Sequence, residues 1–413
     1  MLALIALRNL SRNRRRTLLS LSVVTVGFVG MLLTAGFIRY SFAGLSEAVI
    51  KGGLGHLEIT TTTAPDEGVS PADRSGRPPV LTDWRSMRDA IEQRPHVRAV
   101  GAVVQFAGVA TNGENSASFM GLAVEPDREQ RMGMDVRLRE GVNLSTGTAG
   151  ADLDEALLGV GLARALGAHP GDTVTVMAAT PDGSLNAVDM TVTGLFTTGL
   201  QELDGRVLKT TVASAQRLLG TENVTSLVVG LDDVDATAQA EADLRGLGSA
   251  GPEPLSVLNW ETRAPFYGQV RALYGGIFAF LGTIVGMLVA LSISNTMLMS
   301  VLERVREFGT LLAIGTSRAH LAVLLMFEAL WLALIGGVAG SILGMGLVLV
   351  INASKIEMPP PPGAADPIDL ALTVVAVDFL WIFLGMTAIL LLAAVPPLLR
   401  VVRIEIIDAL GHV

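Results

Sequence analysis

The chain has 413 residues, half of them hydrophobic and 17% charged, and its mean hydropathy is +0.52. These values argue against an ordinary soluble protein and indicate a membrane protein with one sizeable polar insert. The sequence has no cysteine, which excludes disulfides and thiolate metal sites, and its five histidines begin no H-E-x-x-H motif. We therefore expect no metal site.

The net charge of −9 hides a strong asymmetry along the chain. Residues 1–16 hold five arginines and no acidic residue, whereas residues 39–271 hold 19 basic and 30 acidic residues. Basic segments beside a membrane helix favour the cytosol and attract anionic lipid. We expect residues 1–16 to be a cytosolic N-terminus.

Residues 17–38 carry no charge and are long enough to cross a bilayer as the first transmembrane helix. A cleaved signal peptide is the alternative, but its apolar region usually has only about 7–15 residues, and no A-x-A cleavage site follows here. We favour an uncleaved anchor, with the chain after Arg39 outside the cytosol.

Residues 39–271 alternate β-type runs with turn signals and helical stretches, which predicts an extracytoplasmic α+β domain with its own core, as one body or two lobes. The expected strands are 55–63, 97–110, 172–177, 188–196 and 226–231. The expected helices are 81–93, 155–166, 214–219 and 236–247.

Three further long apolar runs predict transmembrane helices 2, 3 and 4 at residues 272–300, 320–352 and 371–399. The first of them has no charged residue, and the other two hold one acidic residue each, Glu328 and Asp378. The proline-rich link 353–370 between the last two is expected to be a short, irregular extracytoplasmic loop. Basic residues gather on the opposite side, so the tail 400–413 and both termini should be cytosolic.

Residues 301–319 connect the second and third spans and have a pattern of their own. Val301, Val305, Phe308 and Leu312 follow helical spacing, which predicts an amphipathic helix at the membrane surface. Opposite charges stand three residues apart, at Glu303/Arg306 and Arg304/Glu307. Gly315 suits the residue after a helix C-cap and Ser317 an N-cap, which together predict a tight turn before the next span.

This stretch resembles the C-terminal membrane domain of FtsX-like ABC permeases, the group that includes MacB, LolC and LolE. The matching residues are Glu303, Arg304, Arg306, Glu307, Gly309, Leu311, Ala313 to Gly315, Ser317, Glu328 to Leu330, Gly336, Gly337 and Gly340. Phe308 departs from the family, which usually has an aliphatic residue there. The resemblance implies that a coupling helix docks on a cytosolic ATPase through Glu303, Arg304, Arg306, Glu307, Phe308, Gly309, Gly315 and Ser317.

The outer domain resembles the same group more weakly, chiefly in residues 156–176, and looks like the MacB periplasmic core domain. The resemblance implies a bacterial inner-membrane permease that works as a homo- or heterodimer with two ABC ATPase subunits. It implies a lipoprotein or another amphiphile as cargo. The alternative is an FtsX-like signalling scaffold that acts on an extracytoplasmic partner protein and regulates a cell-envelope enzyme.

The sequence contains none of the catalytic or nucleotide-binding motifs that we considered. It contains no G-x-x-x-x-G-K-[ST] and no G-x-S-x-G, so we expect no catalytic or cofactor-binding residue, and ATP and Mg²⁺ would be held by the separate ATPase. We expect no nucleic-acid partner.

Two features inside the spans need an explanation. Glu328 lies about two turns inside the third span, where a carboxylate is either a helix-end group reaching the interface or a packing or coupling residue with a partner such as Ser, Thr or Arg. The G-x-x-x-G spacings predict close helix packing, within or between subunits. They involve Gly282, Gly286, Gly336, Gly340 and Gly344.

Overall fold

The computed structural model describes residues 2–12, 14–61, 80–134, 136–146, 153–198, 201–248, 255–358 and 368–403. Its contacts divide the chain into two compact units. The helical unit comprises residues 1–43, 271–358 and 369–413, and the second unit comprises residues 44–270 with 359–368.

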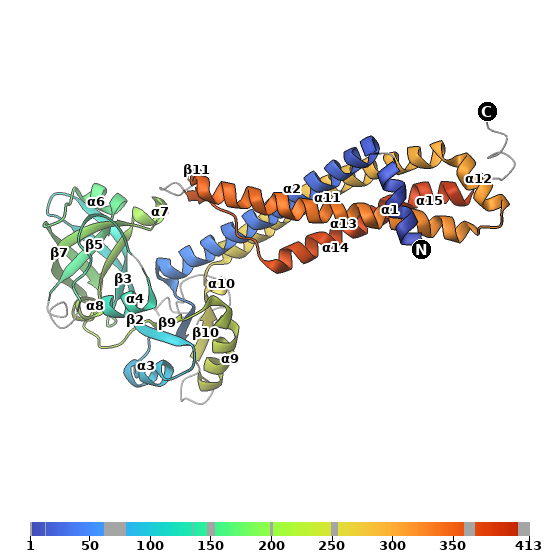
Figure 1. Ribbon diagram of the computed structural model, residues 1–413. Helices are drawn as coiled ribbons and strands as arrows, with labels where there is room; N and C mark the ends of the chain where they lie inside the picture. Colours follow the sequence, from blue (N-terminus) through green and yellow to red (C-terminus); the bar gives the residue numbers. More distant parts are fainter. Residues whose placement is uncertain are drawn as a thin grey trace. The chain divides into compact units, whose positions relative to one another are not determined.

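Four helices among the described residues are long and apolar enough to cross a membrane, as the sequence predicts (Figure 1). They are α2 (Arg14–Val49), α11 (Pro265–Glu303), α13 (Arg318–Ser354) and α14 (Ala376–Ala393), which continues as α15 (Val395–Val402). Helices α2, α11 and α13 extend beyond the predicted spans at both ends, whereas the fourth begins later than predicted, at Ala376. The last helix breaks at Ala394, just before a Pro-Pro pair.

Helices α2 and α13 approach closely along a stripe of small residues. A Cβ atom at Gly336, Gly340 or Gly344 would lie 2.5 to 2.7 Å from a side-chain atom of α2. The facing side chains are those of Val24, Phe28 and Leu32. Three glycines one turn apart thus accept three large side chains one turn apart. This close contact is within the chain.

The glycines of α11 behave differently from those of α13. A Cβ atom at Gly286 would lie 3.1 Å from the Ile389 side chain of α14, whereas one at Gly282 would meet nothing within 4 Å. Gly282 therefore makes no close contact within the described part of this chain, and its expected packing between subunits stays a prediction.

The second unit is built on a ten-stranded sheet with the order β10-β1-β9-β2-β3-β8-β5-β7-β4, in which β6 pairs with β2 and β7. Its strands are β1 (Leu57–Thr61), β2 (Val97–Thr111), β3 (Ser116–Val124), β4 (Arg137–Gly141), β5 (Glu155–Gly159), β6 (Thr173–Ala179), β7 (Leu185–Thr197), β8 (Val207–Thr211), β9 (Ser226–Leu231) and β10 (Leu255–Asn259). Its α-helices are α3 (Trp84–Glu92), α4 (Pro126–Met132), α6 (Val160–Leu166), α7 (Gln201–Asp204), α8 (Val212–Leu219), α9 (Thr237–Gly248) and α10 (Trp260–Arg263).

The long strand β2 belongs to both halves of this sheet. Its first half pairs with β9, and its second half pairs with β3 and β6. Buried apolar side chains from both halves form one continuous cluster. The mixed α+β domain between the first two long helices is therefore as the sequence predicts, built as one body around β2.

Two local expectations from the sequence are wrong. Residues 155–159 form strand β5 rather than the start of a helix, because this apolar run is buried on both faces between β7 and β8, a pattern that periodicity does not distinguish from a helix. The loop 353–370 is not wholly irregular, since β11 (Ile356–Met358) pairs with β12 (Ile368–Leu370). Its proline run lies outside the described residues.

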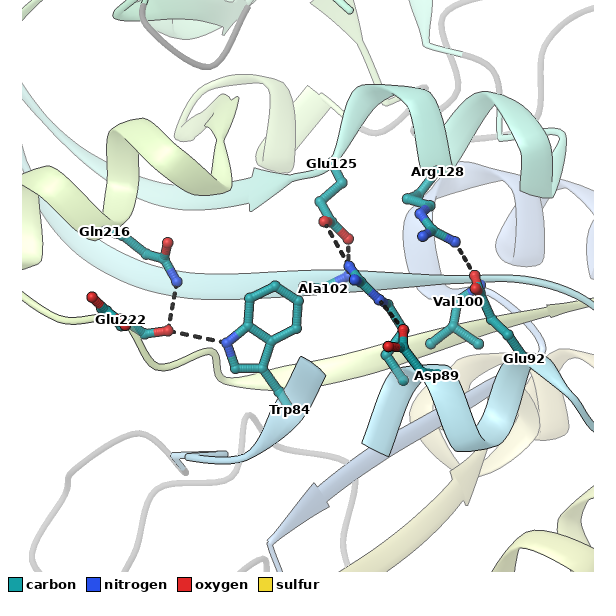
Figure 2. A network of polar contacts seen from close by, with 10 residues as sticks. Trp84, Asp89, Glu92, Val100, Ala102, Glu125, Arg128, Gln216 and Glu222 are labelled. Atoms are coloured by element: carbon teal, nitrogen blue, oxygen red, sulfur yellow. Dashed lines mark hydrogen bonds and ion pairs between the residues drawn. The ribbon is translucent and has the colours of Figure 1, made fainter. Parts of the chain in front are cut away.

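A polar network fixes α3 and α4 to the first half of β2 (Figure 2). The Glu92 carboxylate accepts the backbone N–H of Val100 at 3.3 Å, and the Glu125 carboxylate accepts that of Ala102 at 2.9 Å. Arg128 of α4 pairs with Glu92 of α3. The two carboxylates thus cap the edge of β2 opposite β9, where backbone donors would otherwise be unpaired.

The α2–α13 contact predicts that Gly340→Ala destabilises the full-length protein by about 1–3 kcal/mol, because the new methyl group overlaps the Phe28 side chain. The measurement is thermal unfolding in detergent. Gly282→Ala is the matched control, since its methyl group enters open space. Equal melting temperatures for the two variants would contradict the close packing of α2 on α13.

Candidate coupling site

The connector between α11 and α13 is a short helix packed on the end of the bundle. Helix α11 ends at Glu303, and α12 (Val305–Ala313) begins after Arg304, whose backbone leaves the helical conformation. Val301 and Phe308 are each about 1% exposed, and Leu312 packs against the same apolar cluster. The apolar stripe expected from the sequence therefore faces the bundle.

The turn after α12 is stabilised by caps on both helix ends, that of α12 and that of α13. The N–H of Gly315 donates to Leu312 O and that of Thr316 to Leu311 O, a Schellman motif in which Gly315 takes a φ of +96°. On the other side, the Ser317 hydroxyl accepts the N–H of His320 at 3.3 Å and caps α13. Gly315 and Ser317 therefore hold the terminal positions expected from the sequence.

The two glutamates of the connector are paired with arginines at the start of the chain. Arg16 at the beginning of α2 holds Glu303 with two bonds of 2.6 Å, and Arg12 at the end of α1 (Leu2–Arg12) holds Glu307 at 2.6 Å. Bidentate guanidinium–carboxylate pairs fix orientation as well as distance. The N-terminal helices α1 and α2 thus clamp both sides of the bend between α11 and α12.

Arg304 stands at this bend and joins it to α13. Its guanidinium donates to Glu307 at 2.9 Å and to Glu328 at 3.2 Å, and its charge lies 5.1 Å from the centre of the Phe308 ring. Glu328 is 6% exposed and also accepts a 2.9 Å bond from the Asn9 amide. The buried carboxylate of Glu328 therefore has partners inside the bundle. One of them is an arginine, which compensates for the cost of burying a negative charge.

Glu307 lies outside the membrane-spanning helices, and its ionisation is favoured. Burial pushes the pKa of its carboxyl up, but hydrogen bonds from Arg304 and Arg12 outweigh this and leave the pKa below its ordinary value. A carboxylate with a lowered pKa stabilises the fold above its unfolded pKa, and this stabilisation is lost only as the pH falls through the folded value. The pair is charged at neutral pH.

The opposite face of α12 and its turn are open. Arg306 and Leu311 are exposed, and Ile314 is 75% exposed. Together these three residues form what we call the outward face. The residues of α12 and its start that were expected to couple to an ATPase therefore form two groups. Glu303, Arg304, Glu307, Phe308 and Gly309 contact this chain or are buried in it, whereas Arg306 is exposed.

The sequence patterns did not reveal the N-terminal partners Asn9, Arg12 and Arg16, or the helix α1 that carries two of them. The sequence held part of the signal for these ion pairs. Five arginines precede the first span, and two glutamates flank the bend on the same expected side of the membrane. Periodicity alone does not pair residues about 290 positions apart.

Metal binding finds no support in the described part of the chain, where no three His, Cys, Asp or Glu side chains gather as a metal site would require. The candidate site is therefore one of ion pairs and packing.

Comparison with known proteins agrees with this architecture. Residues 17–247 match the MacB-like periplasmic core domain, and residues 276–406 match the FtsX-like permease C-terminal family. Relatives in these families include non-catalytic membrane subunits as well as fused ATPase/permease proteins.

Individual relatives are distant. The macrolide export ATP-binding/permease protein MacB of Acinetobacter baylyi is 23% identical over 84% of this chain and 51% of its own length. The lipoprotein-releasing system transmembrane protein LolC of Neisseria meningitidis is 24% identical over 83% of this chain and 81% of its own length. LolE of Haemophilus influenzae is 21% identical over 66% of this chain. The chain thus spans about half the length of that MacB. With four apolar helices and this inserted α+β domain, the chain belongs to the FtsX-like ABC transporter permeases that carry a MacB-like periplasmic core domain.

Proposed function

We propose that this chain transmits the ATP-driven motion of a separate ATPase to its own extracytoplasmic domain. The observation that carries the proposal is the clamp on α12, in which Glu303, Arg304 and Glu307 tie the short helix to α1, α2 and α13. A force on α12 is then passed to three other helices instead of being absorbed by a flexible loop.

The two faces of α12 differ in their contacts, which supports a separate role for each. The inward face is held by ion pairs and by the buried Phe308, whereas the outward face offers a cation and two apolar side chains to a partner. An exposed apolar residue beside a charge is typical of a small docking surface. The outward face therefore docks the ATPase, and the inward face carries its motion into the membrane.

The connections to the outer domain support a mechanical route. Helix α2 runs through a π-helical turn (Ile50–Leu54) into β1, and β10 leads through α10 into α11. Strands β1 and β10 pair along five residues, and Glu58 of β1 forms an ion pair with Arg263 of α10. The first two membrane helices therefore enter the same end of one sheet, and a displacement of either strains the same pair of strands.

Membrane placement and assembly follow from this proposal. The end of the bundle that carries α1, α12 and the basic residues faces the cytosol of a bacterium, both termini lie there, and the domain between α2 and α11 lies outside the inner membrane. Two ATPase subunits, which hold ATP and Mg²⁺, serve two permease chains, identical or different. The family implies this dimeric assembly with an ATPase.

For the cargo we propose a lipoprotein or another amphiphile, since two relatives named above belong to lipoprotein-releasing systems. The alternative is a signalling scaffold whose outer domain regulates a cell-envelope enzyme. Crosslinking from the outer domain distinguishes them, because a lipidated protein is captured in the first case and an unlipidated enzyme in the second.

The first test is purification of the full chain, tagged at Val413, with mass spectrometry and an ATPase assay of the eluate. The wild type should bring an ABC ATPase with it. Arg306→Glu combined with Ile314→Asp should lower the recovered ATPase about tenfold, because the change inverts a charge and removes apolar contact area, a loss on the order of 1.4 kcal/mol.

Arg400→Gln is the matched control, since Arg400 is exposed on α15 at the same end of the bundle (Figure 1). Its ATPase recovery should equal that of the wild type, and both variants should melt at the wild-type temperature. Equal recovery with the outward-face variant would place the docking surface elsewhere.

The clamp itself predicts a charge-swap rescue. Arg16→Glu sets two carboxylates against each other and should reduce permease-stimulated ATP hydrolysis several-fold in proteoliposomes. Stability should change little, because the pair is exposed to solvent and surface ion pairs contribute little to folding. Adding Glu303→Arg restores an opposite-charge pair and should recover most of the stimulation. A double variant as impaired as the single one would show that the pair does not transmit the motion.

A further inference from the structure

The first helix, α1, lies at the end of the bundle with part of its apolar surface uncovered. Figure 1 shows it running across the long helices rather than along them. It packs on α13, where the Trp331 indole N–H donates to the carbonyl of Ala3 at 2.8 Å. Three large apolar side chains of α1 are nevertheless exposed, those of Leu4, Ile5 and Leu7. The surroundings of α1 indicate what covers them.

The register of α2 on α13 fixes the level at which α1 lies. The glycine stripe sets these two helices side by side in the same direction, with Leu32 facing Gly344. By this register Arg16 of α2 lies level with Glu328 of α13. Arg16 is the last charged residue before the uncharged run of α2, so Glu328 lies at the boundary of the apolar stretch. Because Asn9 donates to Glu328 at 2.9 Å, α1 lies at this boundary too.

The two flanks of α1 face in different directions. Arg12 pairs with Glu307 of α12 at 2.6 Å. Helix α12 follows the end of the uncharged run of α11, so this flank of α1 faces away from the apolar stretch. At about 100° per residue, Leu7 lies about 140° around the helix from Arg12 and thus on the flank that faces the apolar stretch. Leu4, one turn before Leu7, is 70% exposed. Both leucines therefore lie where the acyl chains of a leaflet begin.

The neighbouring residues of α2 favour lipid as the occupant. Leu18 and Leu19, just inside the boundary, are 63% and 68% exposed and continue the apolar surface of α1 onto the span. Arg14 and Arg15, just outside the boundary, are exposed and form no ion pair with any residue that the structure describes. Such cations attract anionic head groups. Apolar side chains on one side of the boundary and unpaired cations on the other are typical of a helix that lies in a membrane surface.

We propose that α1 is an interfacial helix that binds the surface of an anionic leaflet, the one that surrounds the start of α2. Leu4 and Leu7 enter the acyl region, and Arg14 and Arg15 attract the head groups. Because α1 also holds the bend between α11 and α12, the leaflet steadies α12 from outside the bundle. The inference requires only that α2 spans a membrane, and it holds whether or not an ATPase docks on α12.

The test is electron paramagnetic resonance of the full chain in nanodiscs of phosphatidylglycerol and phosphatidylcholine. The chain has no cysteine, so one introduced cysteine carries a nitroxide label at a single site. Leu4→Cys is compared with Leu19→Cys as the control for lipid and with Ile314→Cys, at a position 75% exposed beyond the bend, as the control for water. The label at Leu4→Cys should be as accessible to oxygen as that at Leu19→Cys. A polar nickel chelate should reach it at least about fivefold less than it reaches Ile314→Cys, because the acyl region excludes the chelate.

The charge of the leaflet is tested with the same label in pure phosphatidylcholine. Nickel access at Leu4→Cys should rise about twofold there, because the attraction of the head groups is lost. Arg14→Gln combined with Arg15→Gln should abolish this difference between the two bilayers. Arg400→Gln combined with Arg403→Gln is the matched control, since it removes two exposed charges at the same end of the bundle, and it should preserve the difference.

The effect on α12 has its own readout. Leu4→Glu combined with Leu7→Glu places carboxylates in the acyl region, which should withdraw α1 from the leaflet. The label at Ile314→Cys should then become more mobile, with a narrower spectrum. An unchanged spectrum would show that the leaflet does not steady α12.

Three further results would overturn the proposal. Nickel access at Leu4→Cys equal to that at Ile314→Cys would place α1 in water. Low access of both oxygen and nickel would mean that protein, such as a second copy of the chain, covers the leucines. An equal effect of the two double-arginine variants would make the dependence on lipid charge a general property of the surface. Thermal unfolding at the wild-type temperature verifies that each labelled variant is folded.

Discussion

The arrangement of the helical unit depends on the rule that a carboxylate among membrane helices must have a partner. Glu328 meets this demand with Arg304 and Asn9, which come from distant parts of the chain. Arg304 reaches Glu328 only because the helix breaks at that residue, and the same guanidinium then holds Glu307. The contacts of the Glu328 carboxylate thus hold the bend, the direction of α12 and the position of α1 against α13. The far end of the bundle follows the same rule, where Arg39 and Asp378 form a bidentate pair.

The glycine stripe and the ion-pair clamp belong to one structural arrangement. Close approach of α2 to Gly336, Gly340 and Gly344 brings the whole of α2 alongside α13, so that its first turn reaches the bend. Without that approach, Arg16 would not be positioned beside Glu303. Interiors packed this densely move as bodies or switch between discrete arrangements and do not deform smoothly. A push on α12 is therefore expected to displace α2 and α13 together.

The sequence predicted the features that local patterns encode. Four long apolar runs predicted four long helices, the stripe through Phe308 predicted which face of α12 is buried, and Gly315 and Ser317 predicted the turn. It did not predict what depends on contacts between distant segments. The run at 155–159 is a strand because it pairs with β7 and β8, and Gly282 has no close neighbour in this chain although its spacing matches that of packed glycines. Arg12 meets Glu307 across 295 positions of sequence. In each case tertiary contacts decide among structures that the local pattern allows.

The distribution of polar groups along the bundle favours transmission of force over conduction through this chain. In the described part of the helical unit, the buried polar residues are Ser20, Thr25 and Glu328, all in the half nearer α1, and Thr387 of α14 adds one buried hydroxyl. The interior beyond them is filled by apolar groups such as Phe28, Leu32 and Met386 packed on glycines. A hydrophilic pathway requires polar groups at successive depths, since unsatisfied polar atoms in hydrocarbon cost several kcal/mol. Within the helical unit, the residues with buried polar side chains gather near the connector and the rest of the bundle is mainly apolar, which suits it to the mechanical role proposed above.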